Sequence, residues 1–303
     1  MSFDKTVSVI GTGAVGGAFI NLFEQTNSSL VSVWSSRSGE LRTEGGKRRF
    51  IPGRSCPVTN DEAGELLILA VPDDQIPHVV NQLAESSIEW NGRRVVHCSG
   101  ARFADSLEPL VAKGARAASM HPVQTFRRGD GRERFLDIFI SLEGDPVLVS
   151  ELLSLVDAAG AKPLKIDKIQ KRALHLAAVI ASNYLVTLQY IAEKFLAERG
   201  VEDGFKLVEP LVKQTTENVV KKGAAGALSG PVERGDLETI TMHLNLLKEN
   251  PDLIQIYARL GLETIELAES AGSAEPGPSP RAEITKLLRQ ALTGGGGKES
   301  AEG

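Results

Sequence analysis

A glycine-rich segment near the start of the chain has the spacing of a nucleotide-binding turn. Its residues are Gly11, Thr12, Gly13, Ala14, Val15 and Gly16. In such a turn the first glycine permits the tight bend, the second admits a pyrophosphate, and the third lets the helix pack on the strand. Unpaired N–H groups of the helix N-terminus then face the phosphates. A turn without a ligand is the alternative, but an apolar run before it and a helical pattern after it favour nucleotide binding.

The next apolar run, residues 30–34, ends without the acid that NAD-binding proteins carry there. Ser35, Ser36 and Arg37 follow it instead. A carboxylate at this point binds the ribose hydroxyls and would repel a 2′-phosphate, whereas hydroxyl donors and a guanidinium favour that phosphate. Arg54 and the basic residues 47–49 add positive charge, although a solvated loop explains most of them. The sequence therefore predicts NADP as the cofactor.

Polar or small residues also follow three later apolar runs that we expect to be strands. In doubly wound sheets the ligand lies across the carboxyl ends of the strands. We expect Val71, Pro72, Ser99 and Gly100 to line the cofactor and His121 to contact the substrate.

Three other polar residues near these strand ends have structural explanations. Asp73 and Asp74 are expected to be N-caps of the following helix. His97 lies inside an apolar run, so we expect a core histidine.

A long helical pattern, residues 168–200, carries His175, Ser182 and Asn183 within an otherwise apolar stretch. On a helical wheel His175 and Ser182 lie opposite the apolar stripe, and Asn183 lies at its edge. Buried polar groups are costly unless they are bonded or used. These residues are therefore either a satisfied pair in a helix interface or functional groups. The apolar middle, residues 173–192, predicts burial in a helical core or against a second subunit.

A polar loop precedes a later helical pattern and includes Ser229, Arg234 and Asp236. An ordinary loop capped by Asp236 is one interpretation. A site for an anionic substrate group is the other, with Ser229 and Arg234 as the donors.

The order of the elements predicts an α/β N-terminal domain, with a doubly wound Rossmann-like sheet, and an all-α C-terminal domain. Expected strands cover residues 6–11, 30–34, 65–72, 94–100, 117–122, 137–144 and 161–166, with helices between several of them. After residue 168 the patterns are helical. The expected divisions are 1–166 for the nucleotide domain, 167–271 for the helical substrate and dimerisation domain, and 272–303 for a flexible tail.

The composition excludes several functions. The chain has 303 residues and a net charge of −5, which argues against nucleic acid or an anionic membrane as the partner. Its two cysteines, Cys56 and Cys98, have no metal-like spacing, so no metal is expected. We identify no secretory leader and no apolar run long enough to cross a bilayer, and we expect a cytoplasmic protein.

Six motifs in order resemble the Rossmann-like oxidoreductases that carry a DUF2520 C-terminal domain. They are GTGAVGGA, AVPDD, HCSGA, MHPVQTF, HLAAVIASNY and LSGPVERGD, between about residues 5 and 265. That family is similar in plan to ketopantoate reductase, pyrroline-5-carboxylate reductase and 6-phosphogluconate dehydrogenase. Ketopantoate reductases use a helix Lys as proton donor, with an Asn eight positions later. Here His175 and Asn183 have that spacing, and Val179 replaces the intermediate Asn.

The resemblance implies an NADPH-dependent reductase of a small carbonyl or imine acid, with a 2-oxo acid such as ketopantoate favoured, acting as a homodimer. His175 would donate the proton, Asn183 would hold the substrate oxygen, and Ser229 or Arg234 would bind a carboxylate. Two alternatives stay open: a catalytically silent NADP-binding sensor or partner protein, and a deazaflavin-dependent NADP reductase.

Overall fold

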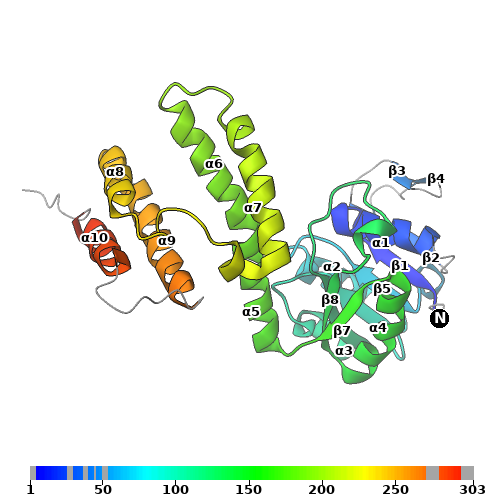
Figure 1. Cartoon of the computed structure of the whole chain (residues 1–303). Coiled ribbons are helices and arrows are strands. Elements are labelled where there is room, and N and C mark those ends of the chain that lie inside the picture. Colours follow the sequence, from blue (N-terminus) through cyan, green and yellow to red (C-terminus); the bar gives the residue numbers. More distant parts are fainter. Residues whose placement is uncertain are drawn as a thin grey trace, which may run out of the picture. The chain divides into compact units, whose positions relative to one another are not determined.

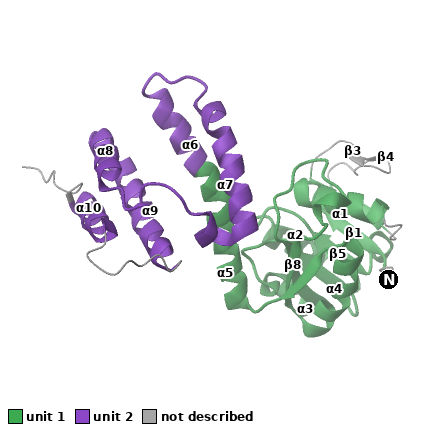
Figure 2. Ribbon diagram, viewed as in Figure 1, with its two compact units in different colours: residues 1–187 green, residues 188–303 purple. Residues whose placement is uncertain are grey.

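The computed structural model describes residues 5–25, 30–36, 40–43, 46–49, 54–270 and 280–294, with only the backbone of 40–43 and 46–49. The chain forms two compact units, Met1–Thr187 and Leu188–Gly303 (Figure 2). The expected domain division at residue 166 marks the start of the long helix, whereas the two units divide inside that helix.

A seven-stranded sheet forms the first unit (Figure 1). Its strands are β1 (Val7–Ile10), β2 (Leu30–Trp34), β5 (Leu66–Leu69), β6 (Arg94–His97), β7 (Arg116–Pro122), β8 (Phe139–Gly144) and β9 (Lys162–Lys165). The spatial order is β2-β1-β5-β6-β7-β8-β9, and neighbours are parallel except β7 and β8. A separate antiparallel pair joins β3 (Glu40–Thr43) and β4 (Gly46–Arg49). All the predicted strands are present, and the expected α/β class is confirmed.

Helices cover both faces of this sheet because its strands are apolar on both sides. On β5, Leu66 and Ile68 pack into the core that α1 (Ala14–Gln25) and α4 (Pro146–Ala159) cover. Leu67 and Leu69 pack into the opposite core with α2 (Ile76–Glu85) and α3 (Glu108–Val111). Alternate residues of one strand therefore serve the two cores. Short 3-10 turns lie at Asn60–Glu62, Ala104–Leu107 and Arg132–Arg134.

The long helix is continuous but not uniform. It consists of α5 (Lys168–Ala178), a π turn (Val179–Asn183) and α6 (Tyr184–Ala197). Its apolar side chains are largely exposed, with Leu176 at 59% and Val186 at 69%. The first unit, which holds this helix up to Thr187, therefore does not itself bury these apolar side chains.

The run Lys168–Ala197 also corrects the expectation that no apolar segment could cross a bilayer. By length and composition this helix is long and apolar enough to do so. One such helix is weak evidence for a membrane span, because a helix that packs in a soluble protein passes the same test.

The second unit is helical and contains α7 (Gly204–Ala227), α8 (Leu237–Leu247), α9 (Pro251–Ser270) and α10 (Pro280–Gly294). Gly223 interrupts α7 with a φ of 74° and so introduces a kink. Ile284 and Leu288 of α10 are fully buried in a core with α8 and α9. The segment expected to be a flexible tail therefore contains a packed helix, because its apolar residues recur at helical spacing.

The start of α5 provides a test of local stability. Asp167 accepts a bond from the Gln170 N–H at 2.8 Å, and the Gln170 side chain accepts one from the Asp167 N–H at 3.0 Å. Replacing Asp167 with Ala should lower the free energy of unfolding by about 1 kcal/mol, because this capping box is lost. Urea denaturation measures the change. The exposed Asp157→Ala serves as control, and an equal loss in both variants would contradict the role of the cap.

Candidate functional site

The glycine turn lies between the end of β1 and the start of α1. Gly11 has a φ of +102°, and a Cβ built on it would lie 2.3 Å from the carbonyl oxygen of Ala70. A Cβ on Gly16 would lie 2.1 Å from the carbonyl oxygen of Gly11. Both positions therefore require glycine for packing. Gly13 differs, since its Cβ would meet nothing within 4 Å, so the turn is open at this point to a ligand.

A cavity of about 330 Å³ lies beside this turn, a volume within the range of small-molecule sites. Its walls combine the ends of β1, β2 and β5 with the first turns of α2. Predicted residues in the wall are Gly11, Thr12, Gly13, Ser35, Ser36, Val71 and Pro72. Ala70, Ser55, Gln75, His78 and Val79 also line it and were missed, because a loop and a helix start give no spacing signal. Ala14, Val15 and Gly16 lie at the start of α1.

The described residues include only part of the cavity end at which we expect the 2′-phosphate of NADP. The Thr12 hydroxyl donates to the Ser35 hydroxyl at 3.0 Å, and Ser36 is exposed beside them. Arg37 lies outside the described residues, as do the side chains of residues 47–49.

Arg54, the other expected source of positive charge, is paired. Its guanidinium donates to both Glu62 carboxylate oxygens, at 2.8 and 2.6 Å, and stacks 4.9 Å from the centre of the Trp34 ring. These hydrogen bonds lower the pKa of Glu62 to about 2. Because the carboxylate offsets the charge, Arg54 adds less positive field than we expected.

A second group of polar residues lies at the ends of β6 and β7. The ring centres of His121 and His175 are 6.4 Å apart, edge to face. Gly100 lies between them, since its Cβ would fall 2.7 Å from His175 Nδ1 and 2.9 Å from His121 Nε2. The structure thus brings three predicted site residues together. Burial, and next the charge of Lys171, lower the pKa of His121 to about 4, so its imidazole is neutral at pH 7.

His97 is a core histidine, as predicted. It is fully buried, and burial lowers its pKa to about 4. Its Nδ1 accepts a bond from the Ser99 N–H at 3.2 Å. Its Nε2 therefore carries the hydrogen and donates to the carbonyl oxygen of Phe103 at 2.9 Å.

The capping prediction for Asp73 and Asp74 is wrong. Gln75 is the N-cap residue of α2 and makes no side-chain cap bond. Asp73 instead accepts a bond from the Ser99 hydroxyl at 2.8 Å, and Asp74 accepts one from Gln75 Nε2 at 3.1 Å. Asp73 thereby links the end of β5 to the end of β6 and fixes Ser99 near His97.

Lys171, a site residue not predicted from the sequence, is buried against these strand ends with 1% of its surface exposed. Its ammonium donates to the Ser99 carbonyl oxygen at 2.9 Å and to the Ser119 hydroxyl at 2.6 Å. Burial lowers the pKa of Lys171 to about 8, against the opposing effect of the Glu143 carboxylate. The spacing of one helical turn between Lys171 and His175 was the signal in the sequence that could have identified it.

The π turn changes the relation between His175 and Asn183. The Tyr184 N–H donates to the Val179 carbonyl oxygen, a bond across five residues. Such a turn holds about one residue more than an α-helical turn and so sets the following residues back by about 100°. The spacing from His175 to Asn183 then acts as a spacing of seven, which places both on one face. A wheel for a uniform helix puts Asn183 at the edge instead.

Ser229 and Arg234 belong to the second unit, in the loop between α7 and α8, and both are exposed. Asp236 is the N-cap of α8 and accepts bonds from the Thr239 N–H at 3.0 Å and hydroxyl at 2.7 Å, so the capping interpretation is confirmed.

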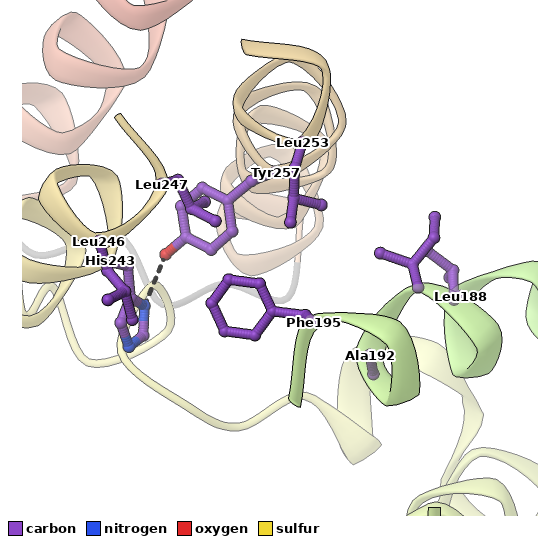
Figure 3. A pocket seen from close by; sticks show the side chains of 9 residues that line it. Leu188, Ala192, Phe195, His243, Leu246, Leu247, Leu253 and Tyr257 are labelled. Carbon is purple, nitrogen blue, oxygen red and sulfur yellow. Dashed lines mark hydrogen bonds between the residues drawn. The ribbon is translucent and has the colours of Figure 1, made fainter. Parts of the chain in front are cut away.

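The same unit has an apolar pocket between α6, α8 and α9, which the sequence did not predict. His243 Nδ1 and the Tyr257 hydroxyl are hydrogen-bonded at 2.8 Å in its wall (Figure 3).

Family models match two parts of the chain. A Rossmann-like domain matches residues 3–122, and DUF2520, a domain of unknown function, matches residues 138–264. No curated protein matches the sequence.

Solved structures share the fold at low sequence identity. A candidate NADP oxidoreductase from Bacteroides fragilis is 21% identical with a TM-score of 0.68, over 87% of this chain and 99% of its own. An imine reductase from Myxococcus stipitatus in complex with NADP+ is 17% identical with a TM-score of 0.52, over 93% and 99%. A reductive aminase from Aspergillus terreus in complex with NADPH and ethyl levulinate is 16% identical with a TM-score of 0.52, over 98% and 96%. The two family matches give the chain a Rossmann-like domain followed by a DUF2520 domain, and these solved structures share its fold.

Proposed function

We propose that the protein is an NADPH-dependent reductase of a C=O or C=N bond in a small acid, with a 2-oxo acid such as ketopantoate favoured. The observation that carries this proposal is the His121–Gly100–His175 group, which lies at the strand ends of the unit that also holds the glycine turn. Ligands of doubly wound sheets bind across these strand ends.

The residues of the first unit fit a dinucleotide. The open backbone at Gly13 and the N-terminus of α1 suit a pyrophosphate, and Ser35 and Ser36 suit a phosphorylated ribose. When bound, NADPH would supply a hydride to the carbon of the C=O or C=N bond, which would leave an extra electron pair on the oxygen or nitrogen. That atom then needs a proton, which this chain must provide.

Three side chains divide the work on the substrate. His175 donates the proton, giving an alcohol or an amine. His121 is neutral and partly buried beside it, so it orients the substrate by hydrogen bonding without competing as a cationic acid. Asn183, on the same helical face as His175, holds the substrate oxygen.

The similar structures support this class of reaction. They include an imine reductase and a reductive aminase with bound NADP+ or NADPH. Because of these names, we retain a C=N bond as an alternative to the C=O bond of a 2-oxo acid as the group that is reduced.

We also propose that the protein forms a homodimer and acts in the cytoplasm. Tyr184 and Val186 on the long helix are exposed by 55% and 69%, and Leu207 and Val220 on α7 by 63% and 82%. Apolar surface of this extent usually marks an interface. A second copy of the chain is the partner that requires no additional component.

The role of His175 is tested by His175→Gln. The rate of NADPH oxidation with 2-oxo acids and cyclic imines should fall about 100-fold, because general acid catalysis is lost. NADPH binding, followed by nucleotide fluorescence, should not change. Tight NADPH binding by a wild-type protein that reduces none of these substrates would favour the sensor instead.

The account of the ribose end is tested by Ser36→Asp. A carboxylate at this position should weaken NADPH binding about tenfold through repulsion of the 2′-phosphate, with little loss for NADH. Isothermal titration calorimetry gives both affinities. Ser36→Ala is the matched control without charge, and equal weakening of the two nucleotides by Ser36→Asp would refute the assignment.

The dimer is tested by Val186→Glu, which adds a charge to the exposed apolar stretch. Light scattering should give twice the mass of one chain for the wild type and a single-chain mass for the variant, because an unpaired charge in the interface is costly. Lys194→Glu, at an already charged position of the same helix, should remain dimeric. A monomeric wild type would exclude the dimer.

A further inference from the structure

The ammonium of Lys171 is buried in the first unit, and this burial of a charge requires an explanation. It is 1% exposed, and its two hydrogen-bond acceptors, the Ser99 carbonyl oxygen and the Ser119 hydroxyl, are uncharged. A buried ammonium is costly even when its hydrogen bonds are made, and a leucine or methionine could fill the same space. The charge at this position therefore points to a role beyond packing.

Both hydrogen-bond acceptors of Lys171, and its own position in α5, lie next to members of the histidine group, which consists of His121, Gly100 and His175. Ser99 directly precedes Gly100 at the end of β6, and Ser119 lies two residues before His121 on β7. Lys171 itself lies one helical turn before His175 on α5, so the two side chains leave the same face. One ammonium thus connects the backbone of β6, a side chain of β7 and the helix that carries His175.

We propose that Lys171 is a positioning residue of the reductase site, whose buried ammonium ties α5 to the ends of β6 and β7 and so holds His175 against Gly100 and His121. This inference rests on the proposed function, because it concerns the imidazoles that would act on the substrate. In this proposal Lys171 acts on the histidines indirectly, through its hydrogen bonds to Ser99 and Ser119, and does not contact the substrate.

The charge of Lys171 also acts on its surroundings. The ammonium is one of the groups that lower the pKa of His121 to about 4, after burial and before His175. Asp73 at the end of β5 and His97 on β6 also face His121, with opposite effects on its pKa. Glu143 on β8 and Cys98 favour the charged form of Lys171. The cation therefore helps to keep His121 uncharged, and its removal should raise the pKa of His121.

The test is Lys171→Met, which keeps the length of the side chain and removes its charge. In the free protein, without cofactor or substrate, the pKa of His121 followed by NMR of the ring Cε1–H should rise by about one unit. Lys171→Arg keeps the charge and should leave the value near that of the wild type. Lys168→Met, an exposed position of the same helix that pairs with Asp105, is the matched control and should not change it.

A second measurement is made on the wild type, in case Lys171→Met fails to fold. The His121 signal should show a small second inflection near pH 8, where Lys171 loses its proton. An unchanged His121 pKa in folded Lys171→Met, or a wild-type titration without the second inflection, overturns the proposal. Both readouts are independent of turnover, so an inactive protein would refute the reductase and leave the test of Lys171 intact.

If turnover is found, the pH profile of kcat gives a further distinction. Lys171→Met should alter the shape of the profile, because His121 then gains a proton at higher pH. A loss of rate with an unchanged profile would indicate a structural role for Lys171 and would contradict the positioning of the histidines by its charge.

Discussion

The convergence of parallel strand ends at one edge of the sheet is the constraint on which the site depends. β1, β5, β6 and β7 run in the same direction, so their carboxyl ends meet although they are far apart in the sequence. The glycine turn follows β1, Ser99 and Gly100 follow β6, and His121 lies near the end of β7. The sheet thereby places the glycine turn and one imidazole of the pair at the same edge of one unit.

The long helix supplies His175 and contacts the sheet through the charged side chain of Lys171. α5 begins with a capping box at Asp167 and places Lys171 in contact with β6 and β7. Hydrogen bonds to a buried ammonium are directional and strong, so they fix the helix at this point more closely than apolar contacts would. Beyond it, the π turn rotates Asn183 toward the His175 face, and many of the apolar side chains that follow are exposed.

Much of this fold was predictable from local pattern. Short β-branched runs bounded by Gly, Pro or Ser gave every strand of the seven-stranded sheet, because a buried parallel strand must be apolar on both faces. Gly11, Gly13 and Gly16 identified the cofactor turn because their roles are set by backbone geometry next to a strand. Two site predictions failed because they depend on which distant group is nearby. Asp73 has the composition of a cap, but the hydroxyl of Ser99 lies within reach, and Arg54 has Glu62 as a partner.

The sequence by itself determined the class of fold, the position of the nucleotide turn and the candidate pair His175 and Asn183, since each depends on residue type and spacing along one element. Tertiary structure alone decided that Gly100 separates His121 from His175, and that Lys171 is buried rather than solvated. It also decided that one extra residue in a helical turn aligns Asn183 with His175. The physical reason is that burial and electrostatic environment are set by residues that lie close in space but far apart along the chain.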